Sequence, residues 1–271
     1  MSLHITDAEF ADFQDFVYQH AGISMHEGKK ALICARLGRR LQHYQLHSYA
    51  QYFALIQSPE AVAERQVCID LLTTNETYFF REPRHFEWLT QLLRGLPPSD
   101  QTLRVWSAAS SSGEEPYSLA MTLAEHCRQP WQVVGSDISQ RMLERARLGH
   151  YSMMRTRNIA PAFLKRYCLR GTGSQEGTLL IRKELRERVE FMQINLNQTL
   201  PPLGQFDIIF LRNVMIYFDT PTKQAVIDRL VQQLRPGGHL CIGHSESLND
   251  LQHKLQLQAP SIFRKPLKTW T

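Results

Sequence analysis

Apolar residues recur at two different spacings along the chain, and the change of spacing divides the sequence into two regions. From residue 5 to about residue 72 the spacing is helical, and Phe10, Phe13 and Val17 fall on one face of a first helix. Further helices are predicted at residues 29–44, 48–57 and 61–72. This pattern predicts a small all-α domain over residues 1–72.

From residue 86 onward, helical segments alternate with short apolar strands. The strands are predicted at residues 103–108, 132–136, 188–194, 206–211 and 239–243, and the helices at residues 86–93, 116–126, 140–148 and 222–234. Residues 206–211 are apolar almost throughout, so this strand should lie centrally in a sheet that is covered on both faces. The alternation predicts a Rossmann-like α/β fold, and a predicted hairpin at residues 255–267 adds an antiparallel end.

Two segments interrupt these patterns. Residues 151–187 include a turn-rich stretch and a short strand, which predict a small antiparallel insertion. Its edge could accept a strand from a peptide, or it could be a plain insertion. Residues 73–85 join the two regions and contain Phe79, Phe80 and Arg81. They predict either a packed connector or a loop that closes over a ligand, and they separate the helical domain from an α/β domain at residues 86–271.

The loop after the first predicted strand is the strongest candidate for a ligand site. Residues 110–113 are small and Pro116 opens the next helix, so backbone N–H groups can face a ligand. Asp137 closes the next strand, where an acid can hold a ribose diol. The loop has one glycine, too few for a dinucleotide pyrophosphate, whereas Glu114 and Glu115 suit a sulfonium or an ammonium group. This combination favours S-adenosylmethionine; an ordinary strand–helix turn with surface glutamates is the alternative.

Composition places the chain among ordinary globular proteins. Of its 271 residues 43% are hydrophobic and 21% charged, no apolar run reaches 18 residues, and the first residues do not form a secretion signal. The five cysteines are scattered without C-x-x-C spacing, which predicts reduced thiols in a cytoplasmic protein and no zinc site. The net charge of +5 suits an acidic partner without requiring nucleic acid.

One predicted helix is strongly basic. Four of its residues share a face: Lys29, Arg36, Arg39 and Arg40. Residues 28–58 contain no acid, so this face is either a solvated surface or a docking surface for an acidic helical partner. His43 and His47 lie four residues apart, but no carboxylate or third histidine is nearby, so we interpret them as surface histidines.

Several motifs taken together resemble the bacterial chemotaxis receptor methyltransferases (CheR type) over essentially the whole chain. The matching stretches are residues 74–81, 106–109, 113–118, 136–138, 195–196, 212–218 and 243–246. The resemblance implies a class I methyltransferase fold and methyl transfer from S-adenosylmethionine to glutamate side chains on cytoplasmic chemoreceptor helices, with S-adenosylhomocysteine as the product. It also implies cofactor contacts at the positions of Asn75, Thr77, Arg81, Glu115, Asp137, Asn195, Leu196, Arg212 and Asn213. Arg81 and Tyr217 match positions that face the reacting centre.

The resemblance implies partners as well. In such proteins the helical N-terminal domain recognises the receptor, which favours the docking role for the face of Lys29, Arg36, Arg39 and Arg40. Relatives with a Gly-Thr-Gly insertion like residues 171–177 bind a peptide at the receptor's C-terminus, so we expect such a tether. We expect a monomer associated with membrane receptor arrays, with neither nucleic acid binding nor membrane insertion.

The expected chemistry needs no general base. A glutamate side chain has a pKa of about 4.3 and is already ionised at neutral pH, so the enzyme must supply alignment. Arg81 would bind a carboxylate and Tyr217 would orient one, while His244 and Ser245 would have a structural or cofactor-pocket role.

Competing functions fit parts of the same sequence. A nicotinamide-dependent dehydrogenase could use a similar sheet but would need more glycines, and residues 213–216 are not the Asn-Pro-Pro-aromatic loop of base methylators. A non-catalytic receptor adaptor, or a methyltransferase acting on another acidic protein, would also be compatible with this chain.

Overall fold

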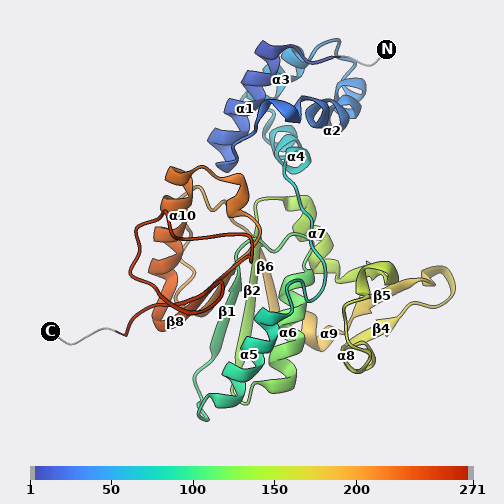
Figure 1. The fold of residues 1–271 in the computed structure, drawn as a ribbon. Coiled ribbons are helices and arrows are strands. Elements are labelled where there is room, and N and C mark those ends of the chain that lie inside the picture. Colours follow the sequence, from blue (N-terminus) through green and yellow to red (C-terminus); the bar gives the residue numbers. More distant parts are fainter. Residues whose placement is uncertain (1–3, 268–271) are drawn as a thin grey trace. The chain divides into compact units, whose positions relative to one another are not determined.

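The structure, a computed structural model, describes residues 4–267, which form two compact units (Figure 1). The helical unit comprises residues 4–74 together with Tyr217–Lys223, and the sheet unit comprises Asn75–Ile216 and residues 224–267. Within residues 4–267 no helix is both long and apolar enough to cross a membrane. The predicted fold class is confirmed: an all-α N-terminal domain precedes a Rossmann-like sheet with a small antiparallel insertion.

Residues 4–74 of the helical unit contain four α-helices, which are α1 (Asp7–Ala21), α2 (Lys30–His43), α3 (Tyr49–Gln57) and α4 (Val62–Leu72). The buried residues of α1, α2 and α3 are apolar or aromatic. Helix α1 begins after the N-cap Thr6 and buries Phe10, Phe13 and Val17, as their spacing predicts. Ile33, Leu37 and Leu41 are the buried residues of α2.

A buried carboxylate joins α2 to α4. Glu64 accepts hydrogen bonds from Arg40 Nε at 2.8 Å, from the Tyr52 hydroxyl at 2.6 Å and from the Tyr44 hydroxyl at 3.0 Å. Burial alone would raise the pKa of Glu64, but these donors outweigh it and hold the pKa below its ordinary value. Arg36 Nη1 donates to the carbonyl oxygens of Leu72 and Thr73 at 3.1 and 3.0 Å.

The arginines on the predicted basic face of α2 therefore have different roles. Arg36 and Arg40 hold α2 against the end of α4 and against Glu64, whereas Arg39 is exposed. Breaking a buried ion pair leaves an uncompensated charge, so Arg40 cannot be changed without disturbing the helical unit.

The sheet unit contains a seven-stranded sheet in the order β6-β2-β1-β7-β8-β10-β9. The strands are β1 (Leu103–Ser107), β2 (Trp131–Asp137), β6 (Val189–Gln193), β7 (Phe206–Leu211), β8 (Leu234–Ile242), β9 (Gln256–Ala259) and β10 (Ile262–Arg264). The five strands from β6 to β8 are parallel, and β10 is antiparallel to β8 and β9. Strand β7 lies in the middle of the sheet and is almost entirely buried, as its apolar composition predicts.

Strand β8 begins earlier than the sequence pattern predicts. Its pairing with β7 shifts register between Phe206–Leu234 and Ile208–His239, so Pro236, Gly237 and Gly238 fall in an irregularity inside the strand. Helix α10 (Thr220–Gln233) has already ended by that point. The proline and glycines therefore act as a bulge within β8, not as the end of the helix.

Helices α5 (Arg84–Gly95), α6 (Glu114–His126) and α7 (Gln140–Leu148) pack onto the parallel part of the sheet. Helix α6 contacts α5, β1 and β2, and α7 contacts β2 and β6 (Figure 1). Gly149 ends α7 with a left-handed φ of 61°. This packing fixes the segments that follow the carboxyl ends of β1 and β2.

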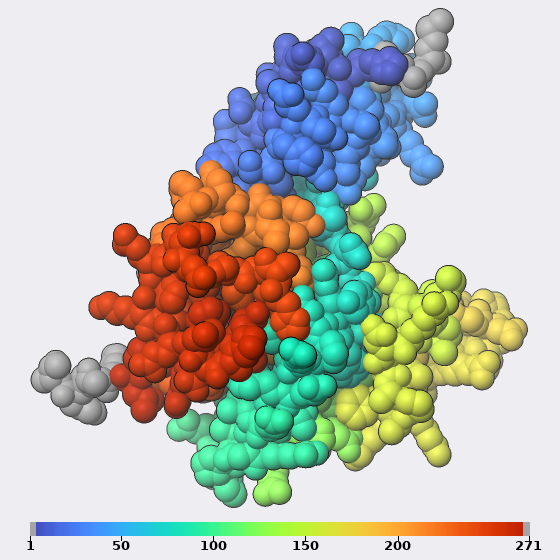
Figure 2. Space-filling model, in the orientation of Figure 1, coloured from blue at the N-terminus to red at the C-terminus, as the bar shows by residue number. Residues whose placement is uncertain are grey.

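The insertion forms a separate three-stranded antiparallel sheet in the order β3-β5-β4. Its strands are β3 (His150–Ser152), β4 (Cys168–Arg170) and β5 (Thr178–Ile181), and it carries the short helices α8 (Pro161–Tyr167) and α9 (Lys183–Arg186). The yellow strands project from the surface of the sheet unit (Figures 1 and 2). Gly171 allows the tight turn after β4, because a Cβ there would lie 1.9 Å from the carbonyl oxygen of Gln175.

Candidate functional site

The candidate site is built from the segments that follow four parallel strands. These are the loop after β1, Asp137 at the end of β2, Arg212 and Asn213 after β7, and residues 243–246 after β8. The carboxyl ends of parallel strands meet at the same edge of a sheet, where open α/β folds bind ligands.

The loop after β1 is held by Asp137. The Ser111 backbone N–H donates to Asp137 Oδ2 at 2.8 Å, and the Ser139 N–H donates to Oδ1 at 2.9 Å. Gly113 has a φ of 95°, and a Cβ there would lie 2.8 Å from Ala146 Cβ, so only glycine fits. The small residues therefore form a close-packed loop beside a carboxylate, a group that can accept several hydrogen bonds at once.

The two glutamates after this loop have different roles. Glu115 accepts a hydrogen bond from the Ser107 hydroxyl at 2.7 Å and pairs with Arg212 at 2.6 Å. Glu114 is fully buried, accepts from the Ser112 hydroxyl at 2.7 Å and pairs with Arg155 at 3.0 Å. Burial raises the pKa of Glu114. The interpretation that both glutamates face a cationic ligand is therefore wrong for Glu114.

Arg212 connects three parts of the site. Its Nη1 lies 2.6 Å from Glu115 Oε2, its Nη2 lies 3.1 Å from Glu82 Oε2, and Nη2 also donates to the Arg81 carbonyl. The side chain is only 1% exposed. Burial would lower the pKa of Arg212, but its two carboxylate partners outweigh that effect and raise it. Arg212 carries one positive charge and Glu82 and Glu115 carry two negative charges, so these three side chains together have an excess negative charge.

Glu82 is a site residue that the sequence reasoning missed. Its backbone has a φ of 57°, and its Oε1 accepts a hydrogen bond from Asn213 Nδ2 at 3.1 Å. Its Oε2 accepts the backbone N–H of His244 at 3.1 Å and faces Arg212. Glu82 therefore joins the segments that follow β7 and β8. Its position next to Arg81 is the one sequence signal that could have indicated it.

Glu246 is the second missed residue, although it lies within a recognised motif. Its carboxylate accepts four backbone N–H groups, from Gly243 at 2.7 Å, Asn213 and Val214 at 2.9 Å and Met215 at 2.8 Å. Burial raises the pKa of Glu246, although these four donors oppose the shift. Asn213 has a left-handed φ of 56°, so this carboxylate holds the loop after β7 in an unusual conformation.

The remaining predicted residues of the sheet unit lie on the segments that border this network. The Asn75 carbonyl accepts from the Ser111 hydroxyl at 3.1 Å, and the Thr77 carbonyl accepts from Arg155 at 3.0 Å. The Arg81 side chain donates to the Glu76 carbonyl at 2.8 Å.

Two further positions follow β6, and one lies outside the sheet unit. Asn195 Oδ1 accepts the Asn197 N–H, and the Leu196 carbonyl accepts from Arg229, both at 2.9 Å. Tyr217 belongs to the helical unit, where its carbonyl accepts the Ser24 N–H at 2.8 Å.

These groups fit S-adenosylmethionine. The cofactor carries a sulfonium and an ammonium group against one carboxylate, so its net charge is positive and suits the excess negative charge around Arg212. Gly113 lets the loop pack closely against Ala146 and Tyr151, and Asp137 ends β2 at the edge of the sheet where open α/β folds bind ligands.

Comparisons with known proteins agree with this interpretation. Residues 75–262 match the family model described as the CheR methyltransferase SAM binding domain, and residues 8–73 match the CheR methyltransferase all-alpha domain. The chain is 42% identical over 267 residues to the chemotaxis protein methyltransferase of Escherichia coli K12, covering 96% of this chain and 92% of that protein. It is 40% identical over 264 residues to chemotaxis protein methyltransferase 2 of Pseudomonas aeruginosa, covering 96% and 94%.

Replacing Glu246 tests whether this carboxylate holds the site loop. Glu246→Ala leaves four backbone N–H groups without their acceptor, so the free energy of unfolding should fall by about 1–3 kcal/mol. Trp88, Trp106 and Trp131 belong to the sheet unit, so their fluorescence in denaturant reports its unfolding. Hydrogen exchange at Asn213 should also become faster.

The matched control is Asp250→Ala, which removes an exposed acid from the same loop and should change neither quantity. Wild-type exchange and stability in Glu246→Ala would contradict the anchoring role.

Proposed function

The chain belongs to the CheR methyltransferase family, and on this basis we propose that it methylates glutamate side chains of chemoreceptors. It is an S-adenosylmethionine-dependent methyltransferase. The observation that carries the proposal is the joint presence of the family's SAM binding domain and an anionic group around Arg212 that suits a sulfonium donor.

The proposed cofactor contacts are those implied by the family resemblance. They are Asn75, Thr77, Arg81, Glu115, Asp137, Asn195, Leu196, Arg212 and Asn213. The hydrogen bonds between Ser111 and both Asp137 and Asn75 support a shared pocket for the first loop. Asp137 would hold the ribose hydroxyls, and Glu115 would stabilise positive charge on the methionine part.

The proposed reaction is a direct displacement. S-adenosylmethionine supplies a methyl group made electrophilic by its sulfonium; the receptor carboxylate forms the new C–O bond as the C–S bond breaks, and no proton is transferred. The residues of the chain provide alignment, which can contribute roughly 7–11 kcal/mol. Arg81 would bind a carboxylate, and Tyr217 would orient the reacting one by a hydrogen bond.

The test uses methyl-labelled S-adenosylmethionine and membranes that contain chemoreceptors. Label should appear on the receptor as an ester that alkali releases as methanol. Arg81→Ala removes a charge-assisted hydrogen bond and should lower kcat/KM by about 10–100-fold, whereas Tyr217→Phe should lower it by about 2–10-fold.

The control variant is Arg128→Ala, an exposed arginine of the sheet unit that should keep the wild-type rate. Alkali-stable label would contradict the glutamyl ester. Unchanged kinetics in both variants would contradict the proposed roles of Arg81 and Tyr217.

The receptor would dock on the basic face formed by Arg36, Arg39 and Arg40 of α2 and by Lys29, which immediately precedes α2 instead of belonging to it as the sequence predicted. The absence of acids from residues 28–58 supports an acidic helical partner. Because Arg36 and Arg40 are bonded within the helical unit, we assign direct contact mainly to the exposed Arg39. Arg36 and Arg40 would then fix the orientation of α2.

Charge reversal at Arg39 separates docking from folding. Arg39→Glu should raise KM for receptor membranes by about tenfold with little change in kcat, because docking charges act before the chemical step. The difference from wild type should shrink as salt is added. Arg128→Glu provides an equal charge change on the other unit and should leave KM unchanged. Equal effects of both variants would contradict a specific docking face.

The insertion would bind a receptor tether peptide near residues 171–177. A pocket of about 560 Å³ lies there, and its lining combines apolar and basic side chains, among them Leu148, Leu169, Leu180, His150, Arg170 and Arg186. Such a lining suits a peptide with one large apolar residue and an acidic one. This interaction would place the enzyme beside receptor arrays on the cytoplasmic side of the membrane.

Peptides taken from receptor C-termini test the tether. Fluorescence anisotropy should show binding that Arg170→Glu weakens by about tenfold, the effect of losing one charge-assisted contact. Arg157→Glu changes an exposed arginine of the same insertion outside the pocket lining and should bind normally. If Arg170→Glu binds the peptide as tightly as the wild type does, the tether does not bind in this pocket.

A further inference from the structure

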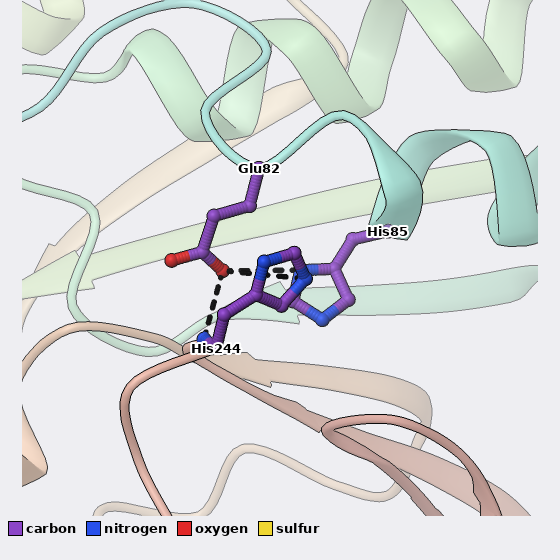
Figure 3. A group of neighbouring side chains, drawn as sticks. All are labelled: Glu82, His85 and His244. Atoms are coloured by element: carbon purple, nitrogen blue, oxygen red, sulfur yellow. Dashed lines mark hydrogen bonds and ion pairs between the residues drawn. The ribbon is translucent and has the colours of Figure 1, made fainter.

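Three side chains of the sheet unit with possible metal-ligand atoms lie close together beside Arg212. Glu82 precedes α5, His85 lies in the first turn of α5, and His244 follows β8. One carboxylate oxygen and one nitrogen of each imidazole all lie within 4.8 Å of one another. In Figure 3 both imidazole rings gather around the same Glu82 oxygen, and the ring centroids are 4.7 Å apart.

His85 is the unusual member of the group. Its side chain is fully buried, and neither ring nitrogen has a hydrogen-bond partner among residues 4–267. Its Nδ1 lies 3.4 Å from Glu82 Oε2. A ring nitrogen that makes no hydrogen bond leaves its lone pair free for a metal ion.

The charged side chains around the group carry a net negative charge, which favours binding of a cation. Glu82 and Glu115 carry two negative charges against the single positive charge of Arg212. The group thus offers one carboxylate oxygen and two imidazole nitrogens as possible metal ligands.

We propose that Glu82, His85 and His244 bind a divalent transition-metal ion such as Zn²⁺, and that the bound ion opposes binding of the methyl donor. Two imidazoles and one carboxylate are a ligand set that suits Zn²⁺, whereas Mg²⁺ and Ca²⁺ prefer oxygen ligands. Tetrahedral Zn²⁺ ligands lie about 3.3–3.5 Å apart. Glu82 and His85 are already at that spacing, and His244 Nε2 is 4.0 Å from Glu82 Oε2. The His244 side chain is 39% exposed and can turn to close the site.

A metal ion at this site would oppose binding of the methyl donor because it would bind Glu82, the partner of Arg212. Its Oε2 also lies 3.1 Å from Arg212 Nη2, so an ion on this oxygen must weaken that ion pair. Arg212 would keep Glu115, but it would move relative to Asn213 and Glu82. This second part of the inference depends on the proposed cofactor contacts of Arg212 and Asn213.

Titration calorimetry of the full chain with Zn²⁺ measures the site directly. One Zn²⁺ should bind per chain, and Mg²⁺ should not bind. Glu82→Gln and His244→Ala should each raise the Zn²⁺ dissociation constant at least about tenfold. Even the loss of a residue that hydrogen-bonds to a metal ligand lowers metal affinity by about 10–100-fold. The control His253→Ala removes another exposed histidine and should bind as wild type. Bound Co²⁺ should show no thiolate absorption band.

Absence of Zn²⁺ binding, or equal binding in wild type and both ligand variants, would overturn the metal site. Saturating S-adenosylhomocysteine should raise the Zn²⁺ dissociation constant, and Zn²⁺ should weaken S-adenosylhomocysteine binding by the same factor. Independent binding of the two would overturn the antagonism. Because S-adenosylhomocysteine binding is also measured without metal, failure of the metal site is distinguishable from failure of the proposed function.

Discussion

The buried guanidinium of Arg212 is the interaction on which the site depends. It joins the end of β7 to Glu115 at the start of α6 and to Glu82 before α5. A buried charge is costly to desolvate unless it is paired, and removal of one partner is more costly than never having formed the pair. The position of three site segments and the stability of the sheet unit are thus coupled through one side chain.

The same ion group sets the electrostatic character of the pocket. Two carboxylates around one guanidinium leave an excess negative charge, and charges interact more strongly inside a protein than in water. A methyl donor with a net positive charge suits this environment better than a dinucleotide phosphate does. The buried imidazole of His85 lies beside the same Glu82 carboxylate, where the proposed metal ion would compete with the methyl donor.

Helix α2 shows how residues of one type on one face acquire different roles. Its arginines share a face by helical periodicity, yet Arg40 is bound to the buried Glu64 and Arg36 caps the end of α4. Arg39 points to solvent instead. Arg36 and Arg40 therefore fix α2 within the helical unit, and Arg39 is the arginine of this face that is exposed to a partner.

The sequence by itself determined the layout of the chain. Helical spacing predicts the all-α domain, alternating apolar strands predict the Rossmann-like sheet, and the motifs around Gly113 and Asp137 predict the methyl donor. These signals are local, because periodicity, turn residues and motif spacing depend on residues near one another in the chain. They require no knowledge of distant partners.

Only the tertiary structure decided how the charged residues of the candidate site pair with one another. Glu115 meets Arg212 across 97 positions of sequence, whereas the adjacent Glu114 turns inward to Arg155. Glu82 and Glu246 were not recognised because their partners come from other strands. A one-residue step along a helix turns a side chain by about 100°, so sequence neighbours can face opposite environments, and only packing selects between them.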